Sequence, residues 1–225
     1  MSSPPPPPRV LVVGGSPRAG DSYALAVADS VVDAFVAEHP GAEVDRLDAF
    51  TDIAPFGARQ TDAKMAVIGG APVPSEDADA WDGVVAVWER LAAADLVVIA
   101  APIWNHGLPW ALKLFIDTVT QPGLAFGFDP AEGYHGLLGG RRAVVVHTSA
   151  VWSPGVPPAF GTDDASPYLR GWLEFVGIDD VREVRLHTTY PTPDLDERVE
   201  RAHAEARAIG YDLAAGARRS AHIAA

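Results

Sequence analysis

The chain has 225 residues, of which 48% are hydrophobic, and it carries a formal net charge of −13. A chain of this size can bury one sizeable core, so we expect a single domain over residues 9–215, between a disordered proline-rich tail at 1–8 and a frayed tail at 216–225. The negative charge disfavours nucleic acids and anionic membranes as partners.

The sequence lacks cysteine and lacks long apolar runs, and both absences limit the functions that the protein can have. The chain contains no cysteine, which excludes a disulfide framework and thiol catalysis. No apolar run approaches the ~20 residues that a membrane span requires. We therefore expect a soluble, cytoplasmic protein with no membrane partner, whose redox chemistry comes from a bound cofactor.

Strands and helices alternate along the chain. Strands are predicted at Arg9–Val13, Glu43–Leu47, Leu96–Ala100, Ala143–His147 and Val181–Leu186. Helices are predicted at Tyr23–Glu38, Trp81–Ala94, Pro109–Val119, Pro167–Val176 and Leu195–Ala215. Right-handed crossovers between such elements predict an α/β fold with a doubly wound, five-stranded parallel sheet of order 2-1-3-4-5 and helices on both faces.

The first strand passes directly into a loop that suits a phosphate group. Glycines at 14, 15 and 20 let the backbone approach an anion, and Ser16 and Ser22 add hydroxyl donors. The helix that begins at Tyr23 directs its free N–H groups into the loop, so no metal is needed. A plain turn with Ser22 as helix N-cap is the alternative. A P-loop ending and a Gly-x-Gly-x-x-Gly motif are both missing.

The third strand ends in the run Pro102-Ile103-Trp104-Asn105-His106. Proline disfavours the helical conformation in the residue before it, so we expect an extended ledge with unpaired backbone N–H groups. With the Asn105 amide, such a ledge suits a flat ring that carries C=O and N–H groups. In the alternative interpretation, Trp104 belongs to the core and Asn105 caps the helix that begins near Pro109.

The predicted strand order makes the first and third strands neighbours, which brings the loop and the ledge to one crevice. Their combination favours a ligand that has both a phosphate and a ring. Two long segments, 48–80 and 120–140, show little periodicity and are expected to be irregular. Loops of such length in a compact domain are usually functional or disordered.

At this point the residues resemble a known family, the flavodoxin-like FMN-dependent NAD(P)H azoreductases and quinone oxidoreductases. The family's phosphate loop, flavin ledge and following Leu-Lys-x-x-Phe-Asp helix correspond to Ser16–Ser22, Pro102–His106 and Leu112–Asp117. The similarity continues in order through 123–126, 136–143 and 168–178. The resemblance implies a flavodoxin-like domain, FMN as cofactor, NADH or NADPH as co-substrate, and a homodimer with its flavins at the subunit interface.

The resemblance also implies which residues hold the flavin. They come from three segments: Ser16, Arg18, Ser22 and Tyr23; Pro102, Ile103, Trp104, Asn105 and His106; and Thr148, Ser149 and Ala150. The chain departs from the family in that Ala24 replaces a second serine, for which Arg18 would compensate. The family's Ser-Arg-Gly-Gly is replaced by the run that begins at Thr148. Its phenylalanine after the ledge asparagine is replaced by His106, which suits a proton donor or a polar wall.

The implied reaction is a ping-pong hydride transfer from NAD(P)H, through FMN, to a quinone, an azo compound or a related electron-poor aromatic. The flavin performs the chemistry, so no catalytic side chain is required, and His106 is the single candidate. Two alternatives remain open. One is a flavodoxin-like electron carrier or flavin-binding module without small-molecule turnover, and the other is a dedicated flavoenzyme that acts on a biosynthetic aromatic or quinone intermediate.

Overall fold

A computed structural model describes residues 6–223 of the chain. The disordered tail predicted at 1–8 lies mostly outside the described residues, as do the last two positions of the frayed tail predicted at 216–225. The helix predicted to end at Ala215 instead continues to Ile223. Gly216 does not end this helix, since a single glycine in a helix costs only about 1 kcal/mol and the surrounding residues are good helix formers.

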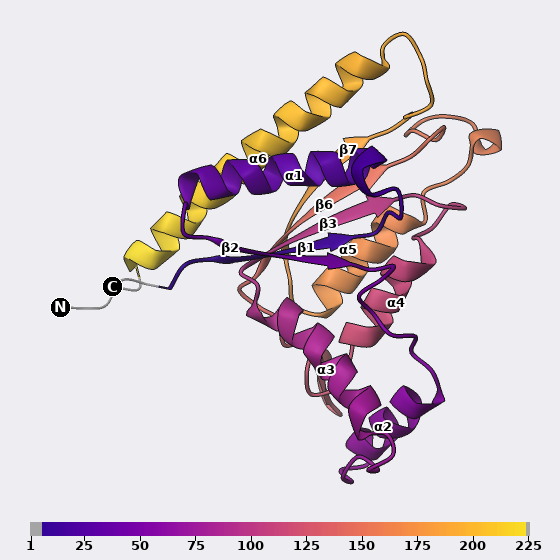
Figure 1. The fold of residues 1–225 in the computed structure, drawn as a ribbon, viewed down its shortest axis with the longest axis vertical. Coiled ribbons are helices and arrows are strands. Elements are labelled where there is room, and N and C mark those ends of the chain that lie inside the picture. Colours follow the sequence, from indigo (N-terminus) through magenta and orange to yellow (C-terminus); the bar gives the residue numbers. More distant parts are fainter. Residues whose placement is uncertain (1–5, 224–225) are drawn as a thin grey trace.

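Five strands form the central sheet: β1 (Arg9–Gly14), β2 (Glu43–Asp48), β3 (Leu96–Pro102), β6 (Arg142–Thr148) and β7 (Asp180–Leu186). Their order is β2-β1-β3-β6-β7, and every pair is parallel. The predicted order 2-1-3-4-5 is confirmed, with β6 and β7 as the fourth and fifth strands. All carboxyl ends therefore lie at one edge of the sheet, the edge to which the arrows point in Figure 1.

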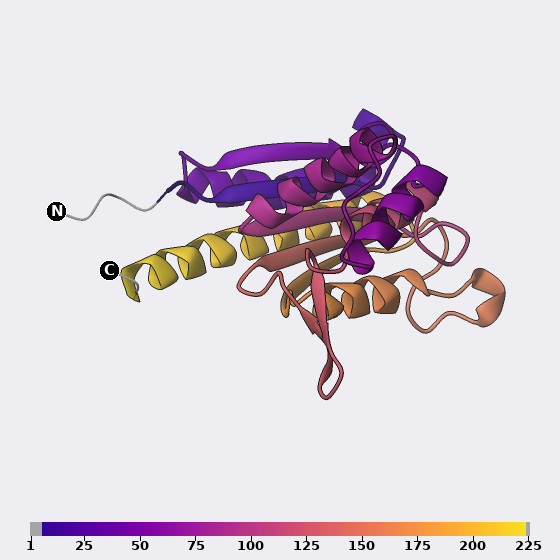
Figure 2. The same ribbon diagram turned by 90° about the horizontal axis from the view of Figure 1, so that it is seen from below.

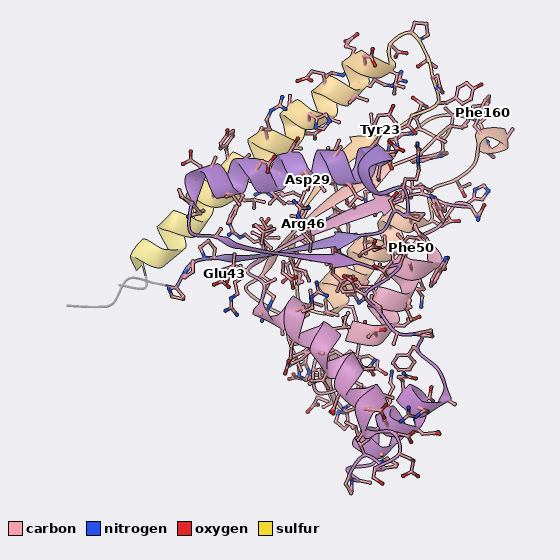
Figure 3. All side chains as sticks on the ribbon, in the orientation of Figure 1. Tyr23, Asp29, Glu43, Arg46, Phe50 and Phe160 are labelled. Atoms are coloured by element: carbon pink, nitrogen blue, oxygen red, sulfur yellow. The ribbon has the colours of Figure 1, made fainter. Side chains whose placement is uncertain are left out.

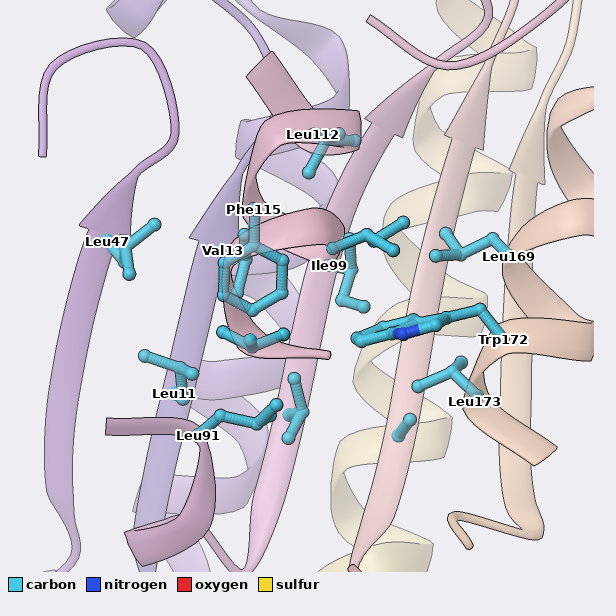
Figure 4. Close-up of a cluster of buried hydrophobic side chains, with 14 of the residues drawn as sticks. Leu11, Val13, Leu47, Leu91, Ile99, Leu112, Phe115, Leu169, Trp172 and Leu173 are labelled. Atoms are coloured by element: carbon cyan, nitrogen blue, oxygen red, sulfur yellow. The ribbon is translucent and has the colours of Figure 1, made fainter. Parts of the chain in front are cut away.

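Five helices lie close to their predicted positions: α1 (Tyr23–Glu38), α3 (Ala78–Ala93), α4 (Trp110–Val119), α5 (Ala165–Phe175) and α6 (Leu195–Ile223). Side chains of a strand alternate between its two faces, which divides the core in two. Val10 and Val12 pack with residues of α1 and α6, whereas Leu11 and Val13 pack with residues of α3, α4 and α5. Figures 1 and 2 show these helices, and Figure 4 shows the second cluster, which includes Phe115 and Trp172.

Both segments that were expected to be irregular contain regular structure. Residues 48–80 include helix α2 (Ala58–Ile68), and residues 120–140 include the antiparallel hairpin of β4 (Phe126–Asp129) and β5 (Gly133–Gly136). Aromatic contacts support the hairpin, because the ring of Tyr134 lies 5.6 Å from that of Phe126 and 5.0 Å from that of Phe128. Figure 2 shows the hairpin projecting from the body of the domain.

Candidate functional site

The loop after β1 carries two buried serine side chains beside the start of α1. The side chains of Ser16 and Ser22 are buried, with 6% and 5% of their residues' surface exposed. The Ser22 oxygen caps α1 by accepting the Leu25 amide at 3.4 Å, and the Ser16 oxygen accepts the Arg18 amide at 3.4 Å. Each hydroxyl keeps its proton for a ligand. The first amides of α1, including that of Tyr23, have no helical acceptor, so the donors fit a phosphate group.

Close backbone packing fixes this loop against β3. The Gly15 amide donates to the Ala100 carbonyl at 3.0 Å. A β-carbon at Gly15 would lie 2.5 Å from that carbonyl oxygen and 2.3 Å from Cδ1 of Leu112, closer than real β-carbons come. Glycine is therefore required there. The guanidinium of Arg18, at the exposed rim, forms no hydrogen bond or ion pair with any residue of 6–223.

The chain after Pro102 forms a tight turn, which corrects the predicted extended ledge. The amides of Trp104 and Gly107 each donate to the other's carbonyl at 2.9 Å, and Asn105 and His106 have φ values of 48° and 72°. Positive φ at both central residues defines a type I′ turn.

The amides at the end of β3 are only partly free. The Ile103 amide donates to the Thr148 carbonyl of β6 at 2.7 Å, and the Trp104 amide is bonded within the turn. Of the predicted donors, only the Asn105 and His106 amides have no acceptor in the described part of the chain. The acceptor for Ile103 comes from a distant strand, which is why the sequence did not reveal it.

The alternative interpretation of this segment is wrong. Helix α4 begins at Trp110 and has Pro109 at its N-cap position, without a side-chain cap, so Asn105 does not cap it. Trp104 is 37% exposed rather than a core residue. The ring of Phe50, after β2, lies 6.0 Å from Trp104 and 5.3 Å from Trp110. These three rings form an aromatic cluster beside the turn. Trp110 also lines a surface cavity of about 630 Å³.

The loops after β6 and β7 are joined to each other. The Ser149 hydroxyl donates to the Trp152 carbonyl and lies 2.9 Å from Nδ1 of His187. Since the single hydroxyl proton is used on Trp152, the Ser149 oxygen accepts from His187, whose proton is then on Nδ1. The carbonyls of Ser149 and Ala150 accept the amides of Thr189 and Tyr190 at 2.8 and 2.9 Å. Thr148 and Ser149 are buried, whereas Ala150 is exposed.

A buried group of titratable side chains supports these loops. Burial lowers the pKa of His147 to about 4, and it also lowers the pKa of His187, with a further contribution from Arg185. Both imidazoles are therefore neutral at pH 7. Burial opposes ionisation of Asp163, but the hydrogen bond from the Ser166 amide and the nearby charge of Arg185 help to outweigh it, and the pKa of this carboxyl is lowered. Arg185 lies 3.5 Å from the same carboxylate.

The structure brings the three predicted segments to one edge of the sheet. The bond from Gly15 to Ala100 joins the first to the second, and the bond from Ile103 to Thr148 joins the second to the third. Figure 3 shows Tyr23, Phe50 and Phe160 at this edge. Sequence reasoning missed Phe50 and His187. His187 directly follows β7 and Phe50 lies two residues beyond β2, so a search of the residues after the carboxyl ends of these two strands would have found both.

A phosphate-sized loop beside a turn at the carboxyl edge of this sheet defines a ligand-binding protein of the doubly wound α/β class. Residues 8–209 match the model of the family described as "Flavodoxin-like fold". The chain belongs to this family.

Curated relatives and solved structures extend the comparison. A protein of Ruegeria pomeroyi named FMN-dependent NADH:quinone oxidoreductase is 43% identical over 195 residues, which is 86% of this chain and 96% of that protein. FMN-dependent NADH:quinone oxidoreductase 3 of Pseudomonas fluorescens is 35% identical over 211 residues, or 92% and 98%. The crystal structure of an azoreductase from Bacillus anthracis has a TM-score of 0.82 at 22% identity, covering 91% of this chain and 99% of that chain. This last similarity shows a shared fold.

Proposed function

We propose that this protein binds FMN and uses it to carry electrons from NADH or NADPH to quinones, and also to azo compounds or related electron-poor aromatics. The observation that carries the proposal is the buried pair Ser16 and Ser22, held by the Gly15 amide against the strand that leads into the Trp104–Gly107 turn. The names of the Ruegeria and Pseudomonas relatives support the same reaction.

The residues at the sheet edge fit the two ends of FMN. The Ser16 and Ser22 hydroxyls, the first amides of α1 and the unpaired Arg18 guanidinium suit the phosphate. The free amides of Asn105 and His106 suit the polar edge of the ring. Thr148 and Ala150 would border the ring from the third segment. Ser149 acts through its loop, because its hydroxyl is already bonded to Trp152.

Bound FMN would supply the two-electron chemistry. The chain's own residues bind the phosphate, orient the ring at the turn and exclude water with the aromatic cluster around Phe50. We infer ping-pong kinetics, in which the oxidised nicotinamide leaves before the acceptor enters the same crevice. No side chain is needed as a catalytic acid in this proposal.

We also propose that the protein is a homodimer of the cytoplasm. Phe128 and Tyr134 on the projecting hairpin are 60% and 64% exposed, and Trp110 is 61% exposed. Large aromatic side chains exposed on a protein surface are typical of a protein–protein interface. A second copy of the chain would cover them. None of the helices within residues 6–223 is long and apolar enough to cross a membrane.

Reconstitution with FMN tests the proposed function. The purified protein should retain the yellow colour and visible absorption of the flavin after gel filtration and oxidise NADH or NADPH with a quinone acceptor. Initial rates at several concentrations of both substrates should give parallel double-reciprocal lines. Loss of the flavin on gel filtration, or the absence of nicotinamide oxidation, would refute the proposed enzymatic function. Flavin retention with no turnover of any small acceptor would instead indicate an electron carrier.

A further inference from the structure

His106 connects the turn after β3 to a segment far along the chain. Its Nδ1 accepts the Thr162 amide at 2.9 Å, and its backbone carbonyl accepts the Asp164 amide at 2.8 Å. The Thr162 hydroxyl also lies 3.0 Å from Nδ1. The turn that would contact the flavin ring is thus tied to the residues that lead into α5, 56 positions later.

The protonation state of the imidazole follows from this contact. A backbone N–H has a fixed direction and is always a donor, so Nδ1 must offer a lone pair to Thr162. The neutral ring then carries its proton on Nε2. A protonated ring would place N–H against N–H, and the bond to Thr162 would be lost. The bond from the Thr162 amide therefore exists only while His106 is neutral, whereas the bond from the Asp164 amide to the backbone carbonyl does not depend on the ring.

The two bonds from Thr162 and Asp164 to His106, here called the tie, hold one end of the 150–164 loop in place. At its start, Ser149 bonds Trp152 and His187, which fixes the loop to the residue after β7. At its end, Asp163 accepts the Ser166 amide at 2.8 Å and so anchors the segment to α5. Between these anchors the loop runs outward from the sheet, with the 53% exposed Phe160 near its tip (Figure 3). His106 is the contact that holds this loop to the turn.

The turn itself requires support. Asn105 and His106 both have left-handed φ values without being glycine, a conformation that L residues adopt only when their surroundings hold them. The bonds from Thr162 and Asp164 to His106 supply that support. The loop and the turn therefore stabilise each other.

We propose that His106 is a positioning residue: its neutral imidazole fixes the 150–164 loop beside the Trp104–Gly107 turn as a wall of the acceptor pocket, and protonation of the ring breaks the bond from the Thr162 amide and so loosens that wall. The role in the acceptor pocket rests on the proposed function, whereas the tie itself is a property of the chain. The residue that departs from the resembled family's phenylalanine thus acts on the loop, not as a proton donor.

Few charged groups face this contact. From the segment before α5 they are Asp164, whose carboxylate lies 3.4 Å from the Thr162 hydroxyl, and Asp163. From β7 the group is Arg185, which pairs with Asp163. The neighbours of His106 in the turn, Asn105 and Gly107, are uncharged.

Amide hydrogen exchange of the FMN-loaded protein, without NADH or acceptor, tests the tie. In His106→Phe the Nδ1 acceptor is lost, and the protection factor of the Thr162 amide should fall roughly fivefold, whereas the Asp164 amide keeps its backbone acceptor and serves as the internal reference. His106→Asn places an oxygen acceptor near the position of Nδ1, tolerates left-handed φ and does not titrate, so it should restore protection. Thr162→Val keeps the amide and removes only the hydroxyl, and should leave the Thr162 protection factor unchanged.

The pH dependence separates this proposal from a merely structural role. Acidification that protonates the ring should lower the protection factor of the Thr162 amide in wild type, because protonation removes the Nδ1 acceptor. In His106→Asn it should stay constant. Equal protection in wild type and His106→Phe, or a decrease with pH that persists in His106→Asn, would overturn the tie. Neither measurement depends on turnover.

Steady-state kinetics test the role of the wall. The KM for a neutral naphthoquinone should rise roughly fivefold in His106→Phe, with kcat changed less than twofold and both values restored in His106→Asn. A loss confined to kcat that asparagine does not restore would show a proton donor and overturn the proposal. If wild type fails to oxidise NADH or NADPH with the quinone while the exchange results hold, the proposed function fails and the tie stands.

Discussion

The loop after β1 and the loops after β3, β6 and β7 meet at one edge of the sheet, but different kinds of contact hold them. In the phosphate loop, the bonds to the Ser16 and Ser22 oxygens come from residues two and three positions away. On the other side, His106 bonds a residue 56 positions away, and Ser149 one that is 38 positions away. Apart from the bond between Gly15 and Ala100, the first half, the loop after β1, is built by local contacts, whereas the second half, the loops after β3, β6 and β7, depends on the assembled tertiary structure.

The largest effect is expected where the two halves touch. In Gly15→Ala the new methyl group meets the Ala100 carbonyl and Leu112, so the loop must move off β3, and the free energy of unfolding should fall by about 3 kcal/mol. Gly20→Ala is the matched control, because a β-carbon there meets no atom within 4 Å. Urea unfolding measures both variants. Equal midpoints for the two would show that the loop does not rely on this contact.

The buried His147 should make the second half sensitive to acid. Its ordinary pKa of 6.5 falls to about 4 in the fold, so between these values the unfolded chain binds more protons and stability decreases as the pH falls. The loss from this group approaches about 3 kcal/mol by pH 4. In His147→Leu, urea unfolding at pH 7 and pH 4.5 should show a smaller difference than in wild type.

Val145→Ala is the control for that measurement, since it removes buried methyl groups from the same strand without removing a titratable group. It should lower stability by roughly 2 kcal/mol at both pH values. If His147→Leu retains the wild-type difference between pH 7 and pH 4.5, the acid sensitivity comes from other groups.

The smallest effect separates the two roles of Ser22. Ser22→Ala removes the N-cap of α1 and should lower stability by about 1 kcal/mol. Ser22→Asp keeps a capping oxygen, so stability should remain close to that of wild type, but its charge repels a phosphate and should weaken FMN binding at least tenfold, about 1.4 kcal/mol. Fluorescence titration with FMN and urea unfolding check the pair. Unchanged FMN affinity in Ser22→Asp would place the phosphate elsewhere.

The elements that the sequence predicted well carry strong local signals. Helix α1 has the predicted bounds because Ser22 caps it and apolar residues recur at helical spacing. Helix α2 was missed because Ala63 is its single buried residue, which leaves no apolar stripe to detect. The hairpin was missed because its strands have four residues each, with glycines at 127, 133 and 136. Its aromatic partner Phe175 lies on a distant helix, 5.1 Å from Phe126.

The candidate site divides in the same way. Ser16 and Ser22 are buried beside a helix terminus, as the phosphate-loop interpretation requires. The extended form expected for the segment after Pro102 was wrong, because a β6 carbonyl and the 162–164 segment fold it into a turn. No local sequence pattern predicts that Thr162 is the hydrogen-bond partner of His106.

By itself, the sequence determined the strand order and the capped turn from β1 into α1, since periodicity, glycine, serine capping and a helix terminus act over a few neighbouring residues. Only the tertiary structure decided the shape of the turn at Asn105 and His106, the tautomers of His106 and His187, and the anchoring of the 150–164 loop. Hydrogen bonds between residues dozens of positions apart fix those features, and their geometry exists only once the strands stand side by side.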